Sequence, residues 1–462
     1  MNRHAMPDVI VVLPGIMGSV LSRHGQVVWG FTPGSIARAL ITGGGAIASS
    51  LMLEDDDEER ESLDDGVTAD ALLPDLHLLP GLWKINGYSR LCQMIESRFE
   101  VTYGENYFHF AYDWRRSNRA SARRLKRLAD GWLRRWRGAG HPQARLILLA
   151  HSMGGLVASH YLEVLEGWRD ARALISLGTP YRGAPKALDA LANGLRKGPL
   201  VFDELTRFAR SCTSIHQLLP IYAAVSDAGA TQRVADVEGL PGVNAQKAVA
   251  ALGFHREIQG AVQAHQGDAV YRQQRCRVFP VAGISQPTLQ SALFEGGRVT
   301  ALGVLDGEDL GGDGTVPRVS ALPQEFDASG VAMYTAALHG SLQDSDAVLQ
   351  HVEGTITSLY IDLGKYLAVD RRVPLSMQAP DLLFDDEPLV LEVGADDPGR
   401  SLRARVLDST SGREVAVARL KDRGDASYAA SLGPLPPGSY HVEVAGDGVL
   451  PIADAFGVGS RA

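Results

Sequence analysis

The stretch LILLAHSMGGLVASHYLE, residues 146–163, constrains the fold of this chain more than any other segment. An apolar run ends at His151 and Ser152, and an apolar helical pattern starts after the two glycines that follow. A buried strand that turns sharply into a helix holds such a serine at the carboxyl end of a sheet, where its Oγ projects. Small neighbours avoid clashes in the strained backbone of this turn. The junction therefore predicts a nucleophile elbow.

The same serine could instead cap the N-terminus of the helix, a common role for serine. A capping serine needs neither a histidine before it nor two glycines after it. The usual elbow pattern is G-x-S-x-G, and Ala150 stands at the first position, where the turn has room for a methyl group. The flanking strand and helix patterns favour the elbow.

Short apolar runs typical of buried parallel strands recur along most of the chain, at residues 9–14, 107–114, 145–150, 173–179, 277–283 and 331–338. Helical patterns lie between many of them, as at 117–137 and 156–166. Strands that alternate with helices predict an α/β sheet covered on both faces. We expect a domain over residues 1–365 with this sheet at its centre.

The pattern changes after about Lys365. Apolar and polar residues then alternate in short runs such as LVLEV, LRARVLD, EVAVARL, YAASL and YHVEVAG, separated by turn signals such as DDPG and LPPGS. Regular short strands of this kind predict a small all-β sandwich, similar to immunoglobulin-like modules, over residues 376–462.

Two regions interrupt the alternation of strands and helices, at about 41–80 and 186–270, and we expect both to be lids or caps over the sheet. The first contains an acidic run, EDDDEERESLDD, which we interpret as a solvated loop. Apolar residues follow it, and exposed leucines in a long loop favour a substrate-facing surface. Leu82 and Trp83, together with Trp114, are expected to line a substrate pocket.

Composition limits the class of protein. Of the 462 residues, 45% are hydrophobic, which is ample for a folded core, and the net charge of −9 disfavours nucleic acid as a partner. Cys92, Cys212 and Cys276 are widely spaced, so neither a disulfide framework nor a zinc site is expected, and no cofactor is implied.

The first residues predict a strand rather than a signal peptide. Since no apolar run is long enough to span a membrane, we expect a soluble, cytoplasmic protein.

A serine nucleophile needs a base and an acid that orients the base, and in this fold class they follow in the order serine, acid, histidine. Asp313 stands in the loop LGGDGTVP, and His339 follows an apolar strand pattern. His339 would take the Oγ proton, while Asp313 would hold the imidazole tautomer. Asp313 could alternatively only close an Asx-turn. The rivals are Asp306 and Asp309, which lack the tight following turn, and His351, which lies within a helical pattern.

The developing oxyanion of an acyl transfer needs backbone donors. One should be the N–H of Met153, the residue after the nucleophile. The other should come from a loop that leaves an early strand, and in LPGIMGS the N–H of Ile16 fits. The alternative is that Gly15 and Gly18 only shape a turn.

These motifs, taken in order, resemble the lecithin:cholesterol acyltransferase-like lipases of the α/β-hydrolase superfamily. LPGIMGS is similar to the family's N-terminal turn, AYDWRRS to its Y-D-W-R segment and LLAHSMGG to its nucleophile elbow. ISLGTPYRGAPKAL, SCTSIHQLLP, GGDGTVP and LHG resemble four later segments. The resemblance covers roughly residues 8–360, and the C-terminal module is not part of the family core.

The resemblance implies an α/β-hydrolase fold with Ser152 as nucleophile, Asp313 as acid, His339 as base, and Ile16 and Met153 as oxyanion donors. In animal members of the family the catalytic histidine lies slightly beyond the L-H-G triplet, and no second histidine follows at that spacing in this chain.

Two charged segments have scaffold interpretations. Within Y-D-W-R, Asp113 and Arg115 are expected to form a buried pair or to bind loop carbonyls. The basic segment RRSNRASARRLKRLADGWLRRWR has a helical period and is interpreted as a solvated helix face, with contact to anionic lipid head groups as the alternative.

The sequence thus predicts a serine esterase, lipase, phospholipase or lipid O-acyltransferase that works through an acyl-enzyme. Its partner would be a lipid or another acyl ester, with peripheral membrane contact as an open alternative. The competing class is a binding or signalling protein that keeps the hydrolase scaffold and meets a protein partner through its C-terminal sandwich. An amidase or peptidase on the same three residues is a third hypothesis.

Overall fold

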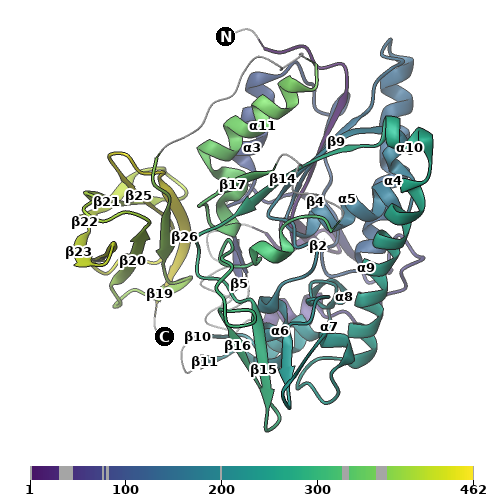
Figure 1. Ribbon diagram of the computed structural model, residues 1–462. Coiled ribbons are helices and arrows are strands. Elements are labelled where there is room, and N and C mark those ends of the chain that lie inside the picture. The colour runs from purple at the N-terminus through teal and green to yellow at the C-terminus, as the bar shows by residue number, and fades with distance from the viewer. Residues whose placement is uncertain are drawn as a thin grey trace.

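In the computed structural model of the protein, the described residues are 3–30, 45–74, 77–79, 83–197, 200–324, 332–360 and 372–460. The described residues up to 360 surround a parallel sheet, and residues 372–460 form a separate pair of sheets beside it (Figure 1).

Six parallel strands form the central sheet, in the order β17, β14, β9, β8, β1, β7. Each strand corresponds to one of the apolar runs in the sequence. The strand before Ser152 lies inside the sheet, and all six of its residues are buried. The strands are β1 (Val9–Leu13), β7 (Tyr107–His109), β8 (Leu146–His151), β9 (Ala171–Leu177), β14 (Arg277–Gly283) and β17 (Met333–Thr335).

Helices cover both faces of this sheet (Figure 1). On one face lie α3 (Ser89–Arg98) and α11 (Asp346–Ser358), and on the other lie α4 (Asn118–Gly138) and α5 (Met153–Glu163). Successive side chains of β1 alternate between the two resulting cores, which is how a strand covered on both faces is buried. The architecture is the predicted α/β-hydrolase fold.

The two edge strands are shorter than the predicted runs 107–114 and 331–338, because the chain leaves the sheet there to build loops. After β7, the Tyr112 hydroxyl donates to the Pro14 carbonyl at 2.9 Å. After β17, the N–H of His339 donates to the carbonyl of Asp313 at 2.8 Å. The segments that follow these two edge strands therefore form loops at the carboxyl edge of the sheet.

Additional elements cap this edge. Helix α2 packs on α7, so the two regions expected to be lids contact each other, and α9 packs on α5. The bounds 41–80 contain α2 (Gly45–Leu51), β4 (Val67–Leu72) and β5 (His77–Leu79), and β2 (Ser19–Arg23), β3 (Gln26–Trp29) and β6 (Trp83–Ile85) flank them. The bounds 186–270 contain most of α6 (Pro185–Asn193), β10 (Arg196–Lys197), β11 (Leu200–Val201), α7 (Asp203–Ser211), α8 (Thr213–His216), β12 (Val225–Asp227), β13 (Ala230–Gln232), α9 (Ala245–Gln266) and the start of α10 (Ala269–Gln274). Strands β15 (Ser291–Glu295) and β16 (Arg298–Leu302) follow outside these bounds.

The C-terminal residues form two sheets around a shared hydrophobic core. The first contains β18 (Leu375–Gln378), β20 (Leu389–Ala395), β24 (Ser427–Leu432) and β23 (Lys421–Gly424). The second contains β19 (Leu382–Phe384), β26 (Ile452–Gly459), β25 (Gly438–Gly446), β21 (Leu402–Asp408) and β22 (Glu414–Arg419). The all-β class is as predicted. Strand β26 was not predicted, because nearly all of it is buried and it lacks the alternation of a half-exposed strand.

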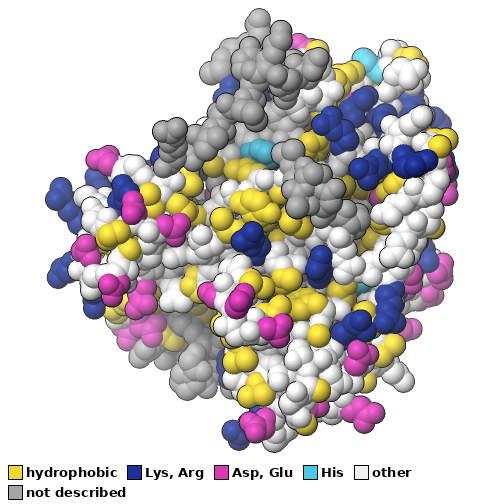
Figure 2. Space-filling model, in the orientation of Figure 1, with side chains coloured by type: hydrophobic (Ala, Val, Ile, Leu, Met, Phe, Trp, Pro, Cys, Tyr) yellow, Lys and Arg dark blue, Asp and Glu magenta, His cyan; other side chains and the backbone are white. Residues whose placement is uncertain are grey.

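The acidic run at 54–65 is an irregular loop in which most residues are exposed, as interpreted from the sequence, and part of it lies against the start of α4. The guanidinium of Arg116 donates to Asp56 at 2.9 Å and to three carbonyl oxygens of the run. Arg119 pairs with Glu58 at 3.1 Å. The start of the basic segment is thus neutralised by acidic neighbours instead of facing solvent, and on the face shown in Figure 2 basic and acidic side chains are interspersed.

Four histidines are buried in the neutral state. They are His151 in β8, His160 in α5, His216 in α8 and His255 in α9. Burial lowers the pKa of His151 to about 3 and the pKa values of the other three to about 4. A buried imidazole costs much less as a neutral group than as a cation.

These four side chains predict a loss of stability in mild acid. The unfolded chain protonates its histidines near their ordinary pKa of 6.5, whereas the folded protein resists protonation down to a pH of about 4. The unfolded state therefore binds more protons in this window. Above this window, the free energy of unfolding should not depend on these histidines. As the pH is lowered through the window, it should fall by up to about 1.4 kcal/mol per pH unit for each histidine. Urea denaturation followed across this range measures the slope.

His255→Gln keeps a donor for the Gln217 carbonyl, which the imidazole Nε2 contacts at 2.8 Å, and removes one titrating group. Its slope should be shallower than that of the wild type. His4→Gln, at an exposed position, is the matched control. Equal stability at neutral and mildly acidic pH would contradict the prediction.

Candidate active site

Ser152 stands between β8 and α5, as predicted for a nucleophile elbow. Its backbone has φ 51° and ψ −124°, a costly conformation for a residue with a side chain. Ser152 occupies the N-cap position of α5, yet its side chain makes no capping hydrogen bond. Its Oγ lies 2.8 Å from Nε2 of His339 instead. The capping alternative therefore does not describe this serine.

The two glycines after Ser152 are required by close packing. A Cβ on Gly154 would overlap the carbonyl oxygen of Pro14 in the loop after β1. A Cβ on Gly155 would overlap the side chain of Thr179 after β9. Thr179 is fully buried, so it has little room to move away. The elbow can thus sit against both neighbouring strand ends only without these side chains.

The three residues predicted as nucleophile, base and acid lie together. The His339 imidazole reaches Ser152 Oγ through Nε2 at 2.8 Å and Asp313 Oδ2 through Nδ1 at 2.7 Å. All three side chains are buried. With the carboxylate accepting from Nδ1–H, Nε2 is left as the acceptor for the serine proton. This arrangement can activate a hydroxyl as a nucleophile.

Asp313 uses its two carboxylate oxygens for different contacts. Oδ1 accepts from the N–H groups of Thr315 at 2.9 Å and Val316 at 2.7 Å, which closes an Asx-turn. Oδ2 faces His339. The Asx-turn alternative and the acid interpretation both describe this residue, because the turn fixes the carboxylate that the imidazole contacts.

The rival residues lie elsewhere. His351 is in α11, where its Nε2 lies 3.3 Å from Thr355 Oγ1. Asp309 Oδ1 accepts from a backbone N–H of its own loop at 2.8 Å, and Asp306 occupies a left-handed turn position with φ 51°. Within the described structure, none of the three rival side chains has a hydrogen bond to Ser152.

The loop after β1 runs directly against the serine. A Cβ on Gly15 would lie 2.8 Å from the Cβ of Ser152. The next residue is Ile16, and Met153 follows the serine itself. Among the described residues, no acceptor takes the N–H of Ile16 or of Met153. Unsatisfied backbone donors beside a nucleophile are what an oxyanion hole requires.

A hydrogen-bond network that was not predicted joins this loop to the base. Tyr88 Oη accepts from the N–H of Gly15 at 2.7 Å and lies 3.0 Å from Nδ1 of His151. The Nε2 of His151 lies 3.0 Å from the carbonyl oxygen of His339. Burial raises the pKa of Tyr88 and lowers that of His151, so both groups are neutral. The phenol therefore donates to Nδ1, and Nε2–H donates to the His339 carbonyl.

The Y-D-W-R segment has the predicted scaffold role. Arg115 is buried and donates to Asp113 through Nε at 2.8 Å and Nη2 at 2.6 Å. It also donates to the Leu51 carbonyl at 3.0 Å and to Asp65 at 2.8 Å. One guanidinium thus ties the first capping region to the central sheet.

The three residues expected to line a substrate pocket have different outcomes. Trp114 packs between Trp29 and Phe208, with ring centroids 5.3 and 5.9 Å away, and it is not among the described residues that line the cavity beside His339. Leu82 lies outside the described residues. Trp83 begins β6, and its side chain also lies outside them. Their pocket roles stay predictions.

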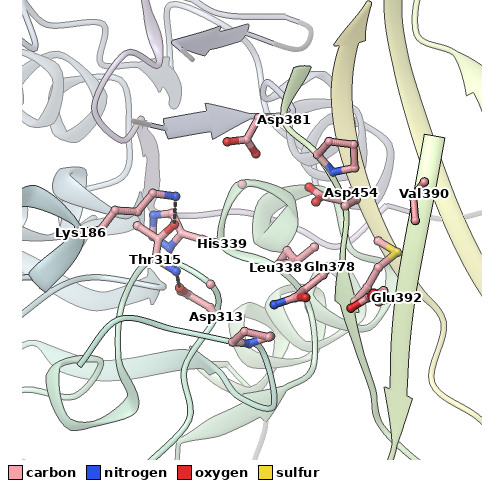
Figure 3. A pocket seen from close by; sticks show the side chains of 16 residues that line it. Lys186, Asp313, Thr315, Leu338, His339, Gln378, Asp381, Val390, Glu392 and Asp454 are labelled. Carbon is pink, nitrogen blue, oxygen red and sulfur yellow. Dashed lines mark hydrogen bonds and ion pairs between the residues drawn. The ribbon is translucent and has the colours of Figure 1, made fainter. Parts of the chain in front are cut away.

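A cavity of about 520 Å³ lies beside His339 and Asp313, between the hydrolase part and the C-terminal sandwich (Figure 3). Of its described lining residues, Lys186 alone belongs to a predicted lid region, so the contribution of the sandwich was not predicted. The hydrolase part supplies Lys186, Pro287, Asp313, Gly314, Thr315, Leu338, His339 and Gly340. The sandwich supplies Met377, Gln378, Ala379, Pro380, Asp381, Val390, Glu392 and Asp454.

No group of three or more His, Cys, Asp and Glu side chains in the described part of the chain is arranged to hold a metal ion. No described helix is both long enough and apolar enough to cross a membrane.

The Tyr88 network predicts a specific loss of stability. Tyr88→Phe removes the oxygen that accepts from Gly15 and donates to His151, and it leaves both partners buried without their hydrogen bonds. We expect the free energy of unfolding to fall by about 1–3 kcal/mol. Urea denaturation at neutral pH measures the change. Tyr103→Phe, at a position that is 62% exposed, is the matched control and should leave stability unchanged. Equal stabilities of the two variants would show that the network contributes nothing.

The chain is similar to a known family over part of its length. The family model described as "Lecithin:cholesterol acyltransferase" matches residues 81–240. The human protein named "Lysosomal phospholipase A and acyltransferase" is 33% identical over 137 residues, which are 28% of this chain and 32% of that protein. The rat protein of the same name is 32% identical over 147 residues, 30% of this chain and 34% of that protein. The match thus spans about a third of the length of these relatives.

Two lipase structures are similar to this chain at low sequence identity. The propeptide form of the Bacillus licheniformis lipase BlEst2 aligns with 98% of this chain and 95% of its own at 13% identity, with a TM-score of 0.32. Its mature form aligns with 78% of this chain and 96% of its own at 14% identity, with a TM-score of 0.30. The fold assignment rests on the sheet order and the helix layers.

The family match contains the elbow but ends before the acid and the base. Ser152 and Met153 lie inside residues 81–240, whereas Asp313 and His339 lie beyond them. The Y-D-W-R segment and the elbow, on which much of the resemblance rested, both fall inside the match. The resemblance is thereby confirmed over residues 81–240, the part of the chain that matches the lecithin:cholesterol acyltransferase family model.

Proposed function

We propose that the protein is a serine esterase or lipase, of the phospholipase or lipid O-acyltransferase type, that works through a covalent acyl-enzyme. One observation carries the proposal. Buried His339 contacts the hydroxyl of Ser152 with one nitrogen and the carboxylate of Asp313 with the other, at 2.8 and 2.7 Å. The strained elbow that presents this serine supports the same role.

In the first half-reaction, Ser152 Oγ attacks the ester carbonyl carbon while His339 Nε2 takes the hydroxyl proton. The carbonyl oxygen gains negative charge, and the N–H groups of Ile16 and Met153 donate to it. Asp313 stabilises the imidazolium. The C–O bond to the alcohol then breaks, the imidazolium returns its proton to the leaving oxygen, and the acyl group stays on Ser152.

In the second half-reaction, a water molecule or the hydroxyl of another lipid takes the place of the alcohol. His339 removes its proton, the new oxygen attacks the acyl carbon, and the proton returns to Ser152 as the product leaves. Water gives hydrolysis and an alcohol gives acyl transfer. The names of the human and rat relatives, which combine phospholipase and acyltransferase, support lipid esters as substrates for this chain.

Other predictions extend this proposal. We propose residues 41–80 and 186–270 as lid regions over the site, supported by the contact of α2 with α7. A cytoplasmic location is retained as a proposal. The competing hypothesis, a binding or signalling role through the sandwich, is separated from the enzymatic one by Ser152→Ala, since a binding role would survive in that variant.

Covalent labelling tests the nucleophile. A fluorophosphonate probe should attach to the native protein at Ser152, because the activated Oγ attacks phosphorus as it attacks an ester carbonyl. Peptide mass spectrometry locates the adduct. Ser152→Ala should lose both the label and ester hydrolysis. Ser159→Ala, about two helical turns further along α5, should keep both. A native wild-type protein that is not labelled would contradict the proposal.

Asp313→Asn tests the acid without disturbing its turn. The amide oxygen can still accept from the N–H groups of Thr315 and Val316, which turns the NH₂ toward His339. An NH₂ group cannot accept from Nδ1–H, so the imidazole is forced into the wrong tautomer. We expect kcat to fall by roughly 10⁴, as the equivalent change does in a serine protease, with little change in stability.

Asp309→Asn, in the same loop, is the matched control and should retain kcat. A pre-steady-state assay with a p-nitrophenyl ester measures the acylation step directly. Similar acylation rates in the two variants would remove Asp313 from the mechanism.

A further inference from the structure

We propose that the C-terminal sandwich is a working part of the active site, and that its β18–β20 face binds the alcohol portion of the substrate. This inference rests on the proposed function and deepens it. The alcohol portion is the group that leaves Ser152 in the first half-reaction, and we identify it as a glycerol-based alcohol that carries a polar head group.

The sandwich contacts the loop that carries His339 both before and after this residue. Leu338, directly before His339, packs into the hydrophobic core of the sandwich. Ser341, two residues after His339, donates through Oγ to the carbonyl of Ala453 in β26 at 3.0 Å. The segment that presents the imidazole is therefore shared between the two parts of the chain.

A single buried side chain connects the loop of the acid to the sandwich. The amide of Gln286 donates to the Leu375 carbonyl at 3.0 Å and accepts from the Met377 N–H at 3.0 Å. Its own backbone N–H donates to the carbonyl of Gly312, next to Asp313, at 3.0 Å. Because Gln286 is only 2% exposed, water competes little for these hydrogen bonds.

Strand β20 turns one row of side chains toward the cavity beside the base. Leu389, Leu391 and Val393 are buried in the sandwich core, and period-two alternation places Val390 and Glu392 on the other face. Both of these line the cavity, and Figure 3 shows them across it from His339 and Asp313. The far wall is thus built by the sandwich.

The lining indicates which part of an ester belongs in the cavity. It includes His339, which handles the proton of the alcohol in both half-reactions. Ser152 and the oxyanion donors Ile16 and Met153 are not among the described lining residues, so the cavity lies on the side of the base rather than on the side of the oxyanion donors. The cavity is therefore on the alcohol side of the reacting bond.

The chemistry of the walls fits a polar alcohol better than a second acyl chain. Apolar side chains such as Met377 and Val390 alternate with polar ones such as Gln378, Glu392 and Lys186. The volume of about 520 Å³ is within the range of small-molecule sites, roughly 300–1,000 Å³. A glycerol backbone with its head group presents the same mixture of apolar and polar surface.

Filling the cavity from the sandwich side tests the inference. Val390→Trp places an indole in the cavity, and the position is 50% exposed, so the fold should tolerate it. The measurement is kcat/KM for two butyrate esters, methyl butyrate and 1-butyryl-glycerophosphocholine. We expect the ratio of kcat/KM for 1-butyryl-glycerophosphocholine to kcat/KM for methyl butyrate to fall at least ~10-fold relative to wild type. A ratio is independent of how much of the preparation is folded. Val417→Trp, at a 45% exposed position on β22 outside the cavity lining, should keep the wild-type ratio.

The outcomes separate this inference from the proposed function. A second variant, Gln378→Trp, fills the cavity from β18. If the wild type hydrolyses both esters and both tryptophan variants keep the wild-type ratio, the sandwich does not bind the alcohol portion, and the proposed enzymatic function is unaffected. If both tryptophan variants lower the ratio and the control does not, the wall is established. If the wild type neither hydrolyses an ester nor takes the fluorophosphonate label, the proposed function itself fails.

Discussion

The two hydrogen bonds of the His339 imidazole are the interaction on which the rest of the site depends. They join three loops from different parts of the chain: the elbow after β8, the loop that carries Asp313 and the loop after β17. Glycines at the ends of the neighbouring strands β9 and β14 pack closely against the side chains that these loops carry, and they leave no space for larger residues. A Cβ on Gly178 would lie 3.1 Å from His339 Nδ1, and one on Gly283 would overlap the side chain of Asp313. The geometry of the imidazole is therefore a consequence of how closely neighbouring strand ends approach.

A second layer of interactions holds the capping regions to this core through charge. Arg115 and Arg116 leave the sheet at the end of the Y-D-W-R segment and bind carboxylates and carbonyls of the chain between β3 and β4. Arg116 and Asp56 are 5% and 6% exposed, and a buried cation is tolerated only when it is paired and fully hydrogen-bonded. Several carbonyl acceptors satisfy this requirement. The first cap is thus attached by specific polar contacts, and hydrophobic contact is supplied by α2 on α7.

The sequence predicted those features that leave a local pattern. Buried strands carry apolar runs, and the elbow carries small residues at a fixed spacing, so the sheet and the position of Ser152 could be predicted. Contacts between distant segments leave no such pattern. The acidic run and the basic helix were each interpreted alone, and neither indicated that Arg116 would bind Asp56. Tyr88 carries no motif, and the sequence distinguishes His151 only by its position beside the serine. The cavity walls of the sandwich were hidden for the same reason, because an exposed Val390 looks like any outward residue of a half-buried strand.

The neutral state of His151 is what allows its neighbour to carry charge. The rings of His151 and His339 have centroids 5.2 Å apart. Two unit charges at this separation would repel by about 3 kcal/mol at an effective dielectric constant near 20. A protonated His151 would therefore oppose the imidazolium that His339 must form when it takes the serine proton. Burial keeps His151 neutral near pH 7, and its Nε2–H instead donates to the His339 carbonyl. His151 thus supports the base by remaining uncharged, and the same burial that serves the site is expected to make the fold sensitive to acid.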